Sequence, residues 1–353
     1  MNLAARPWIV AVILGLLALS TAHAGMTPEE VKAFEGYKAQ AEKGDRVAQN
    51  GLGVCYINGE GVTKDVVQAV LWFRKAAEQE YANAQNGLGY CYINGEGVMK
   101  DAVQAASWFR KAADQGLAAA QNNMGLCYIN GEGEVREDAV QAVSWFRKAA
   151  EQGYANAQDG LGYCYLNGKG VTKDAVQAAS WFRKAAEQGL ATAQTSLGYF
   201  YANGVGVAKD DVQAVSWFRK AAEQGYANAQ SNLGLCYAKG EGVTKDAVQA
   251  VSWFHKAAEQ GVAAAQTSLG YCYVKGEGVA KDEIEAYAYW NLAGITDEVA
   301  RKNLAFLEKE MSSDARLLGQ QRTKRLQKEI EGRLETLDDL RKAVERESLR
   351  KGA

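Results

Sequence analysis

The stretch that decides the fold reads Leu52-Gly53-Val54-Cys55-Tyr56, and a close copy of it returns about every 36 residues. A second string, Trp-Phe-Arg-Lys-Ala-Ala, follows the first with the same step, except for one step of 37 residues where Glu134 is inserted. Copies of the first string begin at Leu52, Leu88, Met124, Leu161, Leu197, Leu233 and Leu269, and copies of the second at Trp72, Trp108, Trp145, Trp181, Trp217 and Trp253. A fixed period of this size is typical of stacked supersecondary units, each in contact only with its neighbours.

The first half of each repeat has the pattern of a helix, here named helix A. Ala48, Leu52, Cys55 and Tyr56 lie at positions i, i+4, i+7 and i+8, which form one face of a helix with 3.6 residues per turn. The segment 58–61, Asn-Gly-Glu-Gly, follows directly. Because Asn and Gly tolerate the left-handed backbone conformation, we expect helix A to end there.

The second half predicts another helix, helix B, which begins at Asp65 as its N-cap. Glycine ends the later copies of helix B, whereas Glu80 stands at that position in the first repeat and should cost stability there. The apolar face of helix B consists of Val66, Ala69, Val70, Phe73, Ala76 and Ala77, and its terminal glycines are Gly116, Gly153, Gly189, Gly225 and Gly261.

Neither helix can bury its apolar face alone, so the hairpins must stack. The small residues Gly53 and Ala69 allow helices A and B to approach closely, while Tyr56, Trp72 and Phe73 fill the space between neighbouring hairpins. The predicted fold is all-α: a right-handed superhelical solenoid of seven helical hairpins, with capping helices at both ends.

The two ends of the array differ from its repeats. The segment 27–30 is a helix start with Pro28 in the first turn, and residues 37–44 align with the second half of a helix B. The segment 282–293 is a diverged helix B in which Tyr289 takes the Trp position. We therefore assign 25–47 to an N-terminal capping helix, 48–294 to seven repeats, and 295–353 to a C-terminal helical cap with a charged tail.

The repeated pattern resembles the Sel1-like repeat, a relative of the tetratricopeptide repeat with a longer loop between its helices. The resemblance rests on Leu-Gly-x-x-Tyr, then x-Gly-x-Gly-Val-x-x-Asp-x-x-x-Ala-x-x-Trp-Phe-x-Lys-Ala-Ala-x-x-Gly, over residues 34–294. It implies a protein–protein adaptor of the kind that bacteria export for envelope assembly, signalling or host contact. It implies no cofactor.

The first 24 residues have the pattern of a secretory signal peptide. Arg6 precedes an apolar run over residues 8–19, and Ala22-His23-Ala24 forms a small-x-small cleavage signal. We expect cleavage after Ala24, a periplasmic or secreted protein, and no membrane span after the leader is removed. The 40 basic and 42 acidic residues nearly cancel, so no basic field favours nucleic acid as a partner.

The six cysteines occupy the same position of helix A, one per repeat: Cys55, Cys91, Cys127, Cys164, Cys236 and Cys272. Equivalent positions of packed helices are about 8–10 Å apart, whereas a disulfide needs Cα atoms within roughly 4.4–6.8 Å. Phe200 stands at this position in the fifth repeat, so the site accepts an apolar group. We predict buried, reduced thiols that form neither disulfides nor a metal site.

Other chemically active residues have ordinary explanations. His255 replaces an arginine at a helix position that we expect to be exposed, and it is the one histidine after the leader. We interpret the glycine loops as tight connections, because they contain no Gly-Lys-Ser/Thr sequence and follow a helix. Their single carboxylates offer too few ligands for calcium, and Arg74 with Glu78 predicts a surface ion pair. No catalytic residue is predicted.

The remaining signal is a row of Asn and Tyr side chains on the face of helix A turned away from helix B. By analogy with tetratricopeptide stacks, this face lines the inner curve. Amides that donate and accept, beside amphipathic tyrosines, suit an extended polypeptide. The predicted partner-binding residues are Asn50, Asn58, Asn86, Tyr90, Asn94, Asn122, Asn130, Tyr163, Asn167, Tyr199, Asn203 and Tyr271. Some of these tyrosines could instead pack against the next helix A.

Three functions remain open at this stage. The first is a non-enzymatic exported adaptor that binds a protein or peptide on the concave face. The second is a β-lactam or cell-wall hydrolase of the cysteine-rich Sel1-like type, for which no Ser-x-x-Lys pattern is found, since Ser107 and Lys111 have the wrong spacing. The third is an effector that acts on host cells.

Overall fold

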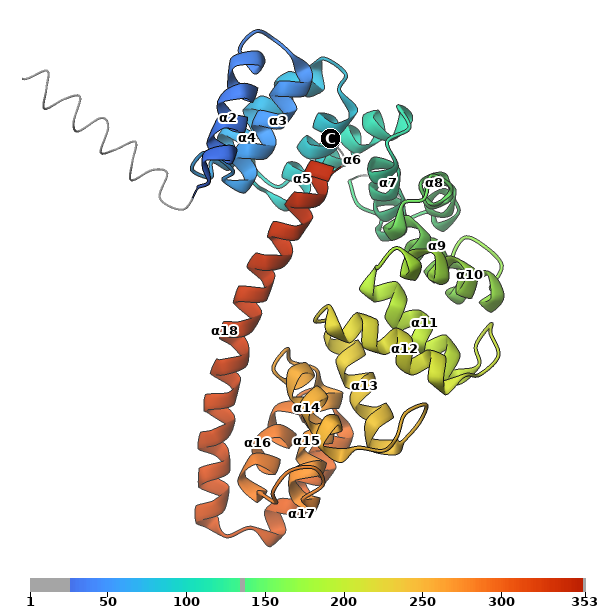
Figure 1. Cartoon of the computed structure of the whole chain (residues 1–353), viewed down its shortest axis with the longest axis vertical. Coiled ribbons are helices and arrows are strands. Elements are labelled where there is room, and N and C mark those ends of the chain that lie inside the picture. Colours follow the sequence, from blue (N-terminus) through green and yellow to red (C-terminus); the bar gives the residue numbers. More distant parts are fainter. Residues whose placement is uncertain (1–25, 134–136, 352–353) are drawn as a thin grey trace, which may run out of the picture. The chain divides into compact units, whose positions relative to one another are not determined.

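The computed structural model describes the backbone of residues 26–133 and 137–351, with side chains up to Glu335 (Figure 1). Every regular element in these ranges is an α-helix, which confirms the predicted all-α fold. The predicted leader and the inserted Glu134 lie outside the described residues. The helices A are α3 (Arg46–Asn58), α5 (Ala82–Asn94), α7 (Ala118–Asn130), α9 (Ala155–Asn167), α11 (Ala191–Asn203), α13 (Ala227–Lys239) and α15 (Ala263–Lys275). The helices B are α4 (Val66–Glu78), α6 (Ala102–Asp114), α8 (Ala139–Glu151), α10 (Ala175–Glu187), α12 (Asp211–Glu223), α14 (Ala247–Ala258) and α16 (Glu283–Ala293).

The array is flanked by α2 (Pro28–Ala41) and by α17 (Glu298–Glu310) and α18 (Ser313–Lys351). The chain divides into two compact units, the first up to Gln152 together with the residues from Arg341, the second from Gly153 to Leu340. From α2 to α8 in the first unit, and from α9 to α17 in the second, each helix packs against the next one in the chain. The predicted right-handed superhelix of the whole array depends on how the two units are placed relative to each other, so its handedness stays a prediction.

The hairpin begins and ends where the local signals place it. Gly59 follows helix A in the left-handed conformation (φ 80°), and its N–H donates to the Cys55 carbonyl at 2.8 Å. The Asp65 carboxylate then accepts from the backbone N–H groups of Val67 and Gln68, each at 3.0 Å, and opens helix B. Both predicted boundaries are confirmed, because the residues that set them act within one turn.

The close approach of helices A and B depends on a glycine. A Cβ added at Gly53 would lie 2.7 Å from two ring atoms of Phe73, which is buried. Real Cβ atoms do not come so near, so only glycine fits at this position. The same contact recurs between Gly89 and Phe109, Gly125 and Phe146, Gly162 and Phe182, Gly198 and Phe218, and Gly234 and Phe254.

The second glycine of the long loop packs against the start of the preceding helix B. Gly97 has a φ of 71°, and a Cβ there would lie 2.1 Å from the carbonyl oxygen of Val66, the first residue of the preceding helix B. Gly61 lies in the same way against the Glu30 carbonyl of α2. The glycine loops are therefore the tight connections that the sequence predicted, and they also fix the stacking of neighbouring hairpins.

A buried glutamine in helix A joins three helices, and the sequence analysis missed it. The Gln85 amide donates to the Ala77 carbonyl of the preceding helix B at 3.2 Å and accepts from Gln115 of its own hairpin at 2.8 Å. Both bonds satisfy polar groups that would otherwise be buried without a partner. The same donation to the preceding helix is made by Gln49, Gln121, Gln194, Gln230 and Gln266.

The arginine of helix B binds the next repeat. Arg74 donates to the hydroxyl of Tyr92 at 3.0 Å, and Arg219 makes the same bond to Tyr237 at 3.0 Å. The predicted ion pair between Arg74 and Glu78 is wrong, because the guanidinium turns toward the neighbouring hairpin instead of along its own helix.

The cap at the C-terminal end is built from α17 and α18. Leu326 and Ile330 of α18 join the apolar cluster formed by α14, α15 and α16, in which Tyr289 is buried at the Trp position. Arg322 of α18 forms an ion pair with Glu285 of α16 at 2.6 Å. Both helices lie within the segment 295–353, which the sequence analysis assigned to a C-terminal helical cap.

Glu80 is the one non-glycine residue with a positive φ (60°) in the described backbone, at the position where later repeats have glycine. The Cβ of an L-residue is strained in this conformation. We expect Glu80→Gly to raise the free energy of unfolding by about 1 kcal/mol, measured by urea titration of the circular dichroism signal. Glu80→Ala removes the carboxylate but keeps the Cβ, so an equal gain from that variant would contradict backbone strain as the cause.

Candidate functional site

The residue after Gly in the repeated string lies in one register of helix A, and it is exposed or partly exposed in every repeat except the first. In the second unit Tyr163, Tyr199 and Tyr271 are 47%, 54% and 47% exposed, and Leu235 is partly exposed. In the first unit the equivalent residues are Val54, Tyr90 and Leu126. We name this set of seven the helix A row.

The row differs in exposure between its members. Leu126 is 43% exposed and Tyr90 is partly buried, whereas Val54 is buried. Leu126 and Leu235 were missed by the sequence analysis, which selected tyrosines. Their position in the repeat could have identified them, because they occupy the same place in the repeated string as Tyr163.

The asparagines that end helix A flank this row. Asn94, Asn130, Asn167 and Asn203 are exposed, and Asn58 is partly exposed, with its amide donating to Glu60 at 2.9 Å. The amides of Asn167 and Asn203 donate to the carbonyls of Tyr163 and Tyr199, each at 2.9 Å. Each of these two asparagines thus lies one turn beyond a row tyrosine on the same side of its helix.

Lysines accompany the row in the second unit. The Nζ of Lys169 lies 5.4 Å from the centre of the Tyr163 ring, and the Nζ of Lys275 lies 5.9 Å from that of Tyr271. Lys239 and Lys275 replace asparagine at the end of α13 and α15. Cations at this distance from an aromatic face contribute about 0.5–1 kcal/mol at exposed sites.

Three of the predicted binding residues are not on the surface. Asn50, Asn86 and Asn122 are buried, so the prediction that they bind a partner on the open face of helix A is wrong. Asn86 accepts a hydrogen bond from Asn123 of the next helix A at 2.9 Å, and Thr192 donates to Asp159, the equivalent residue in α9, at 3.2 Å. Neighbouring helices A therefore meet through this register, and polar side chains there serve stacking.

His255 is not at an exposed position, as the sequence analysis expected. Its Nε2 lies 3.2 Å from the hydroxyl of Tyr273 and its Nδ1 lies 3.2 Å from that of Tyr289. The two tyrosine rings are stacked with their centres 5.9 Å apart. The imidazole takes the place of the arginine that binds the next repeat, and both of its nitrogens face tyrosine hydroxyls of the last hairpin, α15 and α16.

Burial explains why a histidine stands there. Desolvation is the main cause that lowers the pKa of His255 below 6.5, and Arg322 acts in the same direction, whereas Glu259 and Glu285 oppose it. A neutral imidazole can be buried against Tyr273 and Tyr289 at less cost than the charged guanidinium found in other repeats.

The thiols are all buried, as predicted. Burial raises the pKa of Cys127, Cys164, Cys236 and Cys272 to about 11. At neutral pH these groups are protonated, and a protonated thiol is a poor nucleophile and a poor metal ligand. Phe200 at the same register is buried too, which supports the apolar character of the site.

Comparison with known proteins places the chain in a family. Seven segments match the Sel1 repeat: 46–81, 82–117, 118–154, 155–190, 191–226, 227–262 and 263–294. The chain belongs to the Sel1 repeat family, which confirms the predicted resemblance and a solenoid of Sel1-like hairpins. No curated protein matches the chain.

The chain is also similar to solved structures. The chain is 36% identical to a Sel1 repeat protein from Oxalobacter formigenes, with a TM-score of 0.61 over 78% of this chain and 79% of that one. It is 29% identical to c5321, described as a protective antigen present in uropathogenic Escherichia coli strains displaying an SLR fold, with a TM-score of 0.48 over 87% of this chain and 97% of that one. Of the helices in the described ranges, none is both long and apolar enough to span a membrane.

The lowered pKa of His255 predicts how the stability of the last repeats responds to acid. Because its pKa in the folded protein is lower than in the unfolded chain, His255 contributes to stability above pH 6.5, and that contribution is lost as the pH falls through the folded-state value. We expect the difference in unfolding free energy between the wild type and His255→Gln to shrink or reverse as the pH is lowered from 8 to 5. Urea titrations at each pH measure it, and a difference that stays constant would contradict a buried neutral imidazole.

Proposed function

We propose that the protein is a non-enzymatic adaptor that binds an extended polypeptide of a partner protein along the part of the helix A row that lies in the second unit. The observation that supports this most is the exposure of Tyr163, Tyr199 and Tyr271 in one register of α9, α11 and α15. Packing between helices would bury tyrosines in that register. Aromatic side chains exposed at regular intervals are typical of a recognition surface.

The chemistry of the row fits a peptide main chain. Tyrosine offers apolar contact at a low cost in conformational entropy, and the terminal amides of Asn167 and Asn203 in the same unit can both donate to and accept from peptide groups. Packed helices are about 8–10 Å apart, which corresponds to roughly three residues of an extended chain at about 3.3 Å each. A ligand that crosses the helices would therefore place every third residue against a member of the row.

The groups that could act as catalysts have other roles, which supports a binding function. Burial raises the pKa of four of the buried thiols to about 11 and so keeps them protonated, and His255 is packed between Tyr273 and Tyr289. Members of this repeat family act generally as scaffolds. Binding energy along a surface of this kind comes from many contacts, not from one reactive group.

We propose that the protein acts outside the cytoplasm, because residues 1–24 have the charge, apolar run and cleavage signal of a secretory leader. Mass spectrometry of the protein recovered from cell fractions measures this directly. An N-terminus at Gly25 in an exported fraction is expected, and a full-length chain confined to the cytoplasm would contradict export.

Replacing Tyr163, Tyr199 and Tyr271 together by Ala should remove most partner binding, because single aromatic contacts of this kind contribute about 1–2 kcal/mol each. The measurement is the recovery of partners from envelope extract on immobilised protein, identified by mass spectrometry, with circular dichroism to show that the helices are retained. The matched control replaces Val176, Val212 and Val248 by Ala, since these exposed residues lie on helices B of the same unit. An unchanged set of partners for the tyrosine variant would rule out the row as the binding surface.

A further inference from the structure

The first helix of the array, α2, is a helix B without a helix A of its own. Gly61 lies against the Glu30 carbonyl as Gly97 lies against the Val66 carbonyl, so Glu30 is equivalent to Val66. Gln49 donates to Ala41 at 3.2 Å as Gln85 donates to Ala77 at 3.2 Å, which gives the same register. Tyr37 is then equivalent to Phe73 and Ala33 to Ala69, in agreement with the predicted alignment of residues 37–44.

In a complete repeat, helix A of the same hairpin covers this face of helix B. Gly53 packs on the Phe73 ring, and Ile57 belongs to the buried cluster that contains Ala69, Val70 and Phe73. In the described part of the chain only Met26 and Thr27 precede α2, so no described helix takes that place. The result is a difference in exposure: Phe73 is 1% exposed and Tyr37 is 41% exposed.

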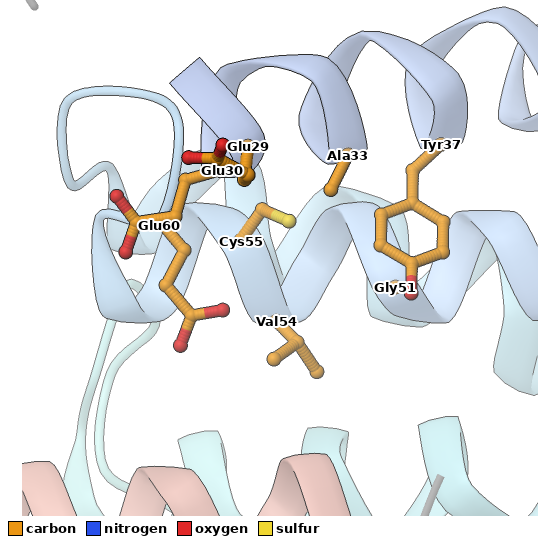
Figure 2. A pocket seen from close by; sticks show the side chains of 8 residues that line it. All are labelled: Glu29, Glu30, Ala33, Tyr37, Gly51, Val54, Cys55 and Glu60. Carbon is orange, nitrogen blue, oxygen red and sulfur yellow. The ribbon is translucent and has the colours of Figure 1, made fainter. Parts of the chain in front are cut away.

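A cavity of about 290 Å³ opens where the missing helix would pack (Figure 2). Ala33 and Tyr37 line it from α2, and Gly51, Val54 and Cys55 line it from α3. In the next repeat the side chain of Ile57 takes part in the equivalent apolar cluster. A mainly apolar cavity near the lower end of the usual size of ligand pockets suits one aliphatic side chain and its surroundings.

Three carboxylates gather at one end of this cavity, and Figure 2 shows them at the end opposite Tyr37. Glu30 accepts from the Thr27 N–H at 2.7 Å, and Glu60 accepts from the Asn58 amide at 2.9 Å. A carboxylate has about four acceptor positions, so Glu29 and Glu30 can bind a cation, and Glu60 adds negative charge beside them. Glu29 and Glu30 also stabilise the first turn of α2, but Glu60 comes from a loop, where that explanation does not apply.

We propose that this face of α2 is a docking site for an amphipathic helix of a partner protein, which takes the place of the missing helix A. The partner helix puts an aliphatic side chain into the cavity and a basic side chain against Glu29, Glu30 and Glu60. The docking surface belongs to the first unit and consists of α2 and α3. It is separate from the row tyrosines of the second unit and does not depend on the proposed function.

The test uses a helix whose packing the protein already shows. The probe is a fluorescent peptide with the sequence of residues 263–275, Ala in place of Cys272, and an i,i+4 lactam on its outer face to hold it helical. Its Val274 is equivalent to Ile57, and Lys275 supplies the cation. Fluorescence anisotropy with the processed protein, its N-terminus verified by mass spectrometry, measures binding.

We expect saturable binding that Ala33→Trp weakens at least about tenfold by filling the cavity. Glu29→Gln with Glu60→Gln should weaken binding and make the remaining binding less sensitive to added salt, because the charges that salt screens are gone. The matched control is Ala39→Trp, an exposed position of α2 outside the cavity lining, which should bind like the wild type. A peptide with Asp in place of Val274 should not bind. Tyr163→Ala with Tyr199→Ala should leave this binding unchanged, which separates it from the row.

Three results would overturn the proposal. The first is no saturable binding up to about 1 mM peptide, and the second is binding that Ala33→Trp leaves unchanged. The third is a concentration-dependent dimer in sedimentation that Ala33→Trp abolishes, which would assign the surface to a second copy of the chain instead of a partner helix.

Discussion

The contact between a glycine of helix A and a phenylalanine ring of helix B is the constraint on which the rest of the structure depends. It brings the two helices of a hairpin together as at Gly53 and Phe73, and in the last hairpin Gly270 faces Trp290 instead. Because it decides which face of helix A turns inward, it also decides which face remains outside. The row tyrosines are exposed because they adjoin, but do not share, the glycine face.

Three further contacts transmit this geometry from one hairpin to the next within each unit. A loop glycine lies against the start of the preceding helix B, a buried glutamine bonds to the end of that helix, and an arginine binds the tyrosine of the following repeat. All three join nearest neighbours, which is the property expected of a repeat array. The ends of such an array differ from its middle. At the C-terminal end α18 packs on the last repeats, and His255 of α14 replaces the arginine found in other repeats. At the N-terminal end α2 keeps an exposed Tyr37.

The sequence alone predicted those features of the fold and the site that depend on residues within one hairpin. The ends of helix A at Asn58-Gly59, the N-cap Asp65, and the exposure of Tyr163 and Tyr199 follow from local residues and helical period. The errors concern contacts with a neighbour. Asn86 meets the next helix A, and His255 is packed between tyrosines of two other helices, which one repeat read alone does not show. The cavity beside α2 was missed for the same reason, since it is defined by a helix that no described segment supplies.

The most direct test of this account is to measure how one added methyl group at the hairpin contact changes the free energy of unfolding. A Cβ at Gly234 would lie 2.7 Å from the buried ring of Phe254 and 3.2 Å from the Ala250 carbonyl, whereas a Cβ at Gly36 of α2 would meet nothing within 4 Å. Urea titration should show that Gly234→Ala lowers the free energy of unfolding by about 1–3 kcal/mol, while Gly36→Ala leaves it equal or raises it by up to about 1 kcal/mol. Equal stabilities for the two variants would contradict the claim that the glycine contact sets the spacing of the hairpin.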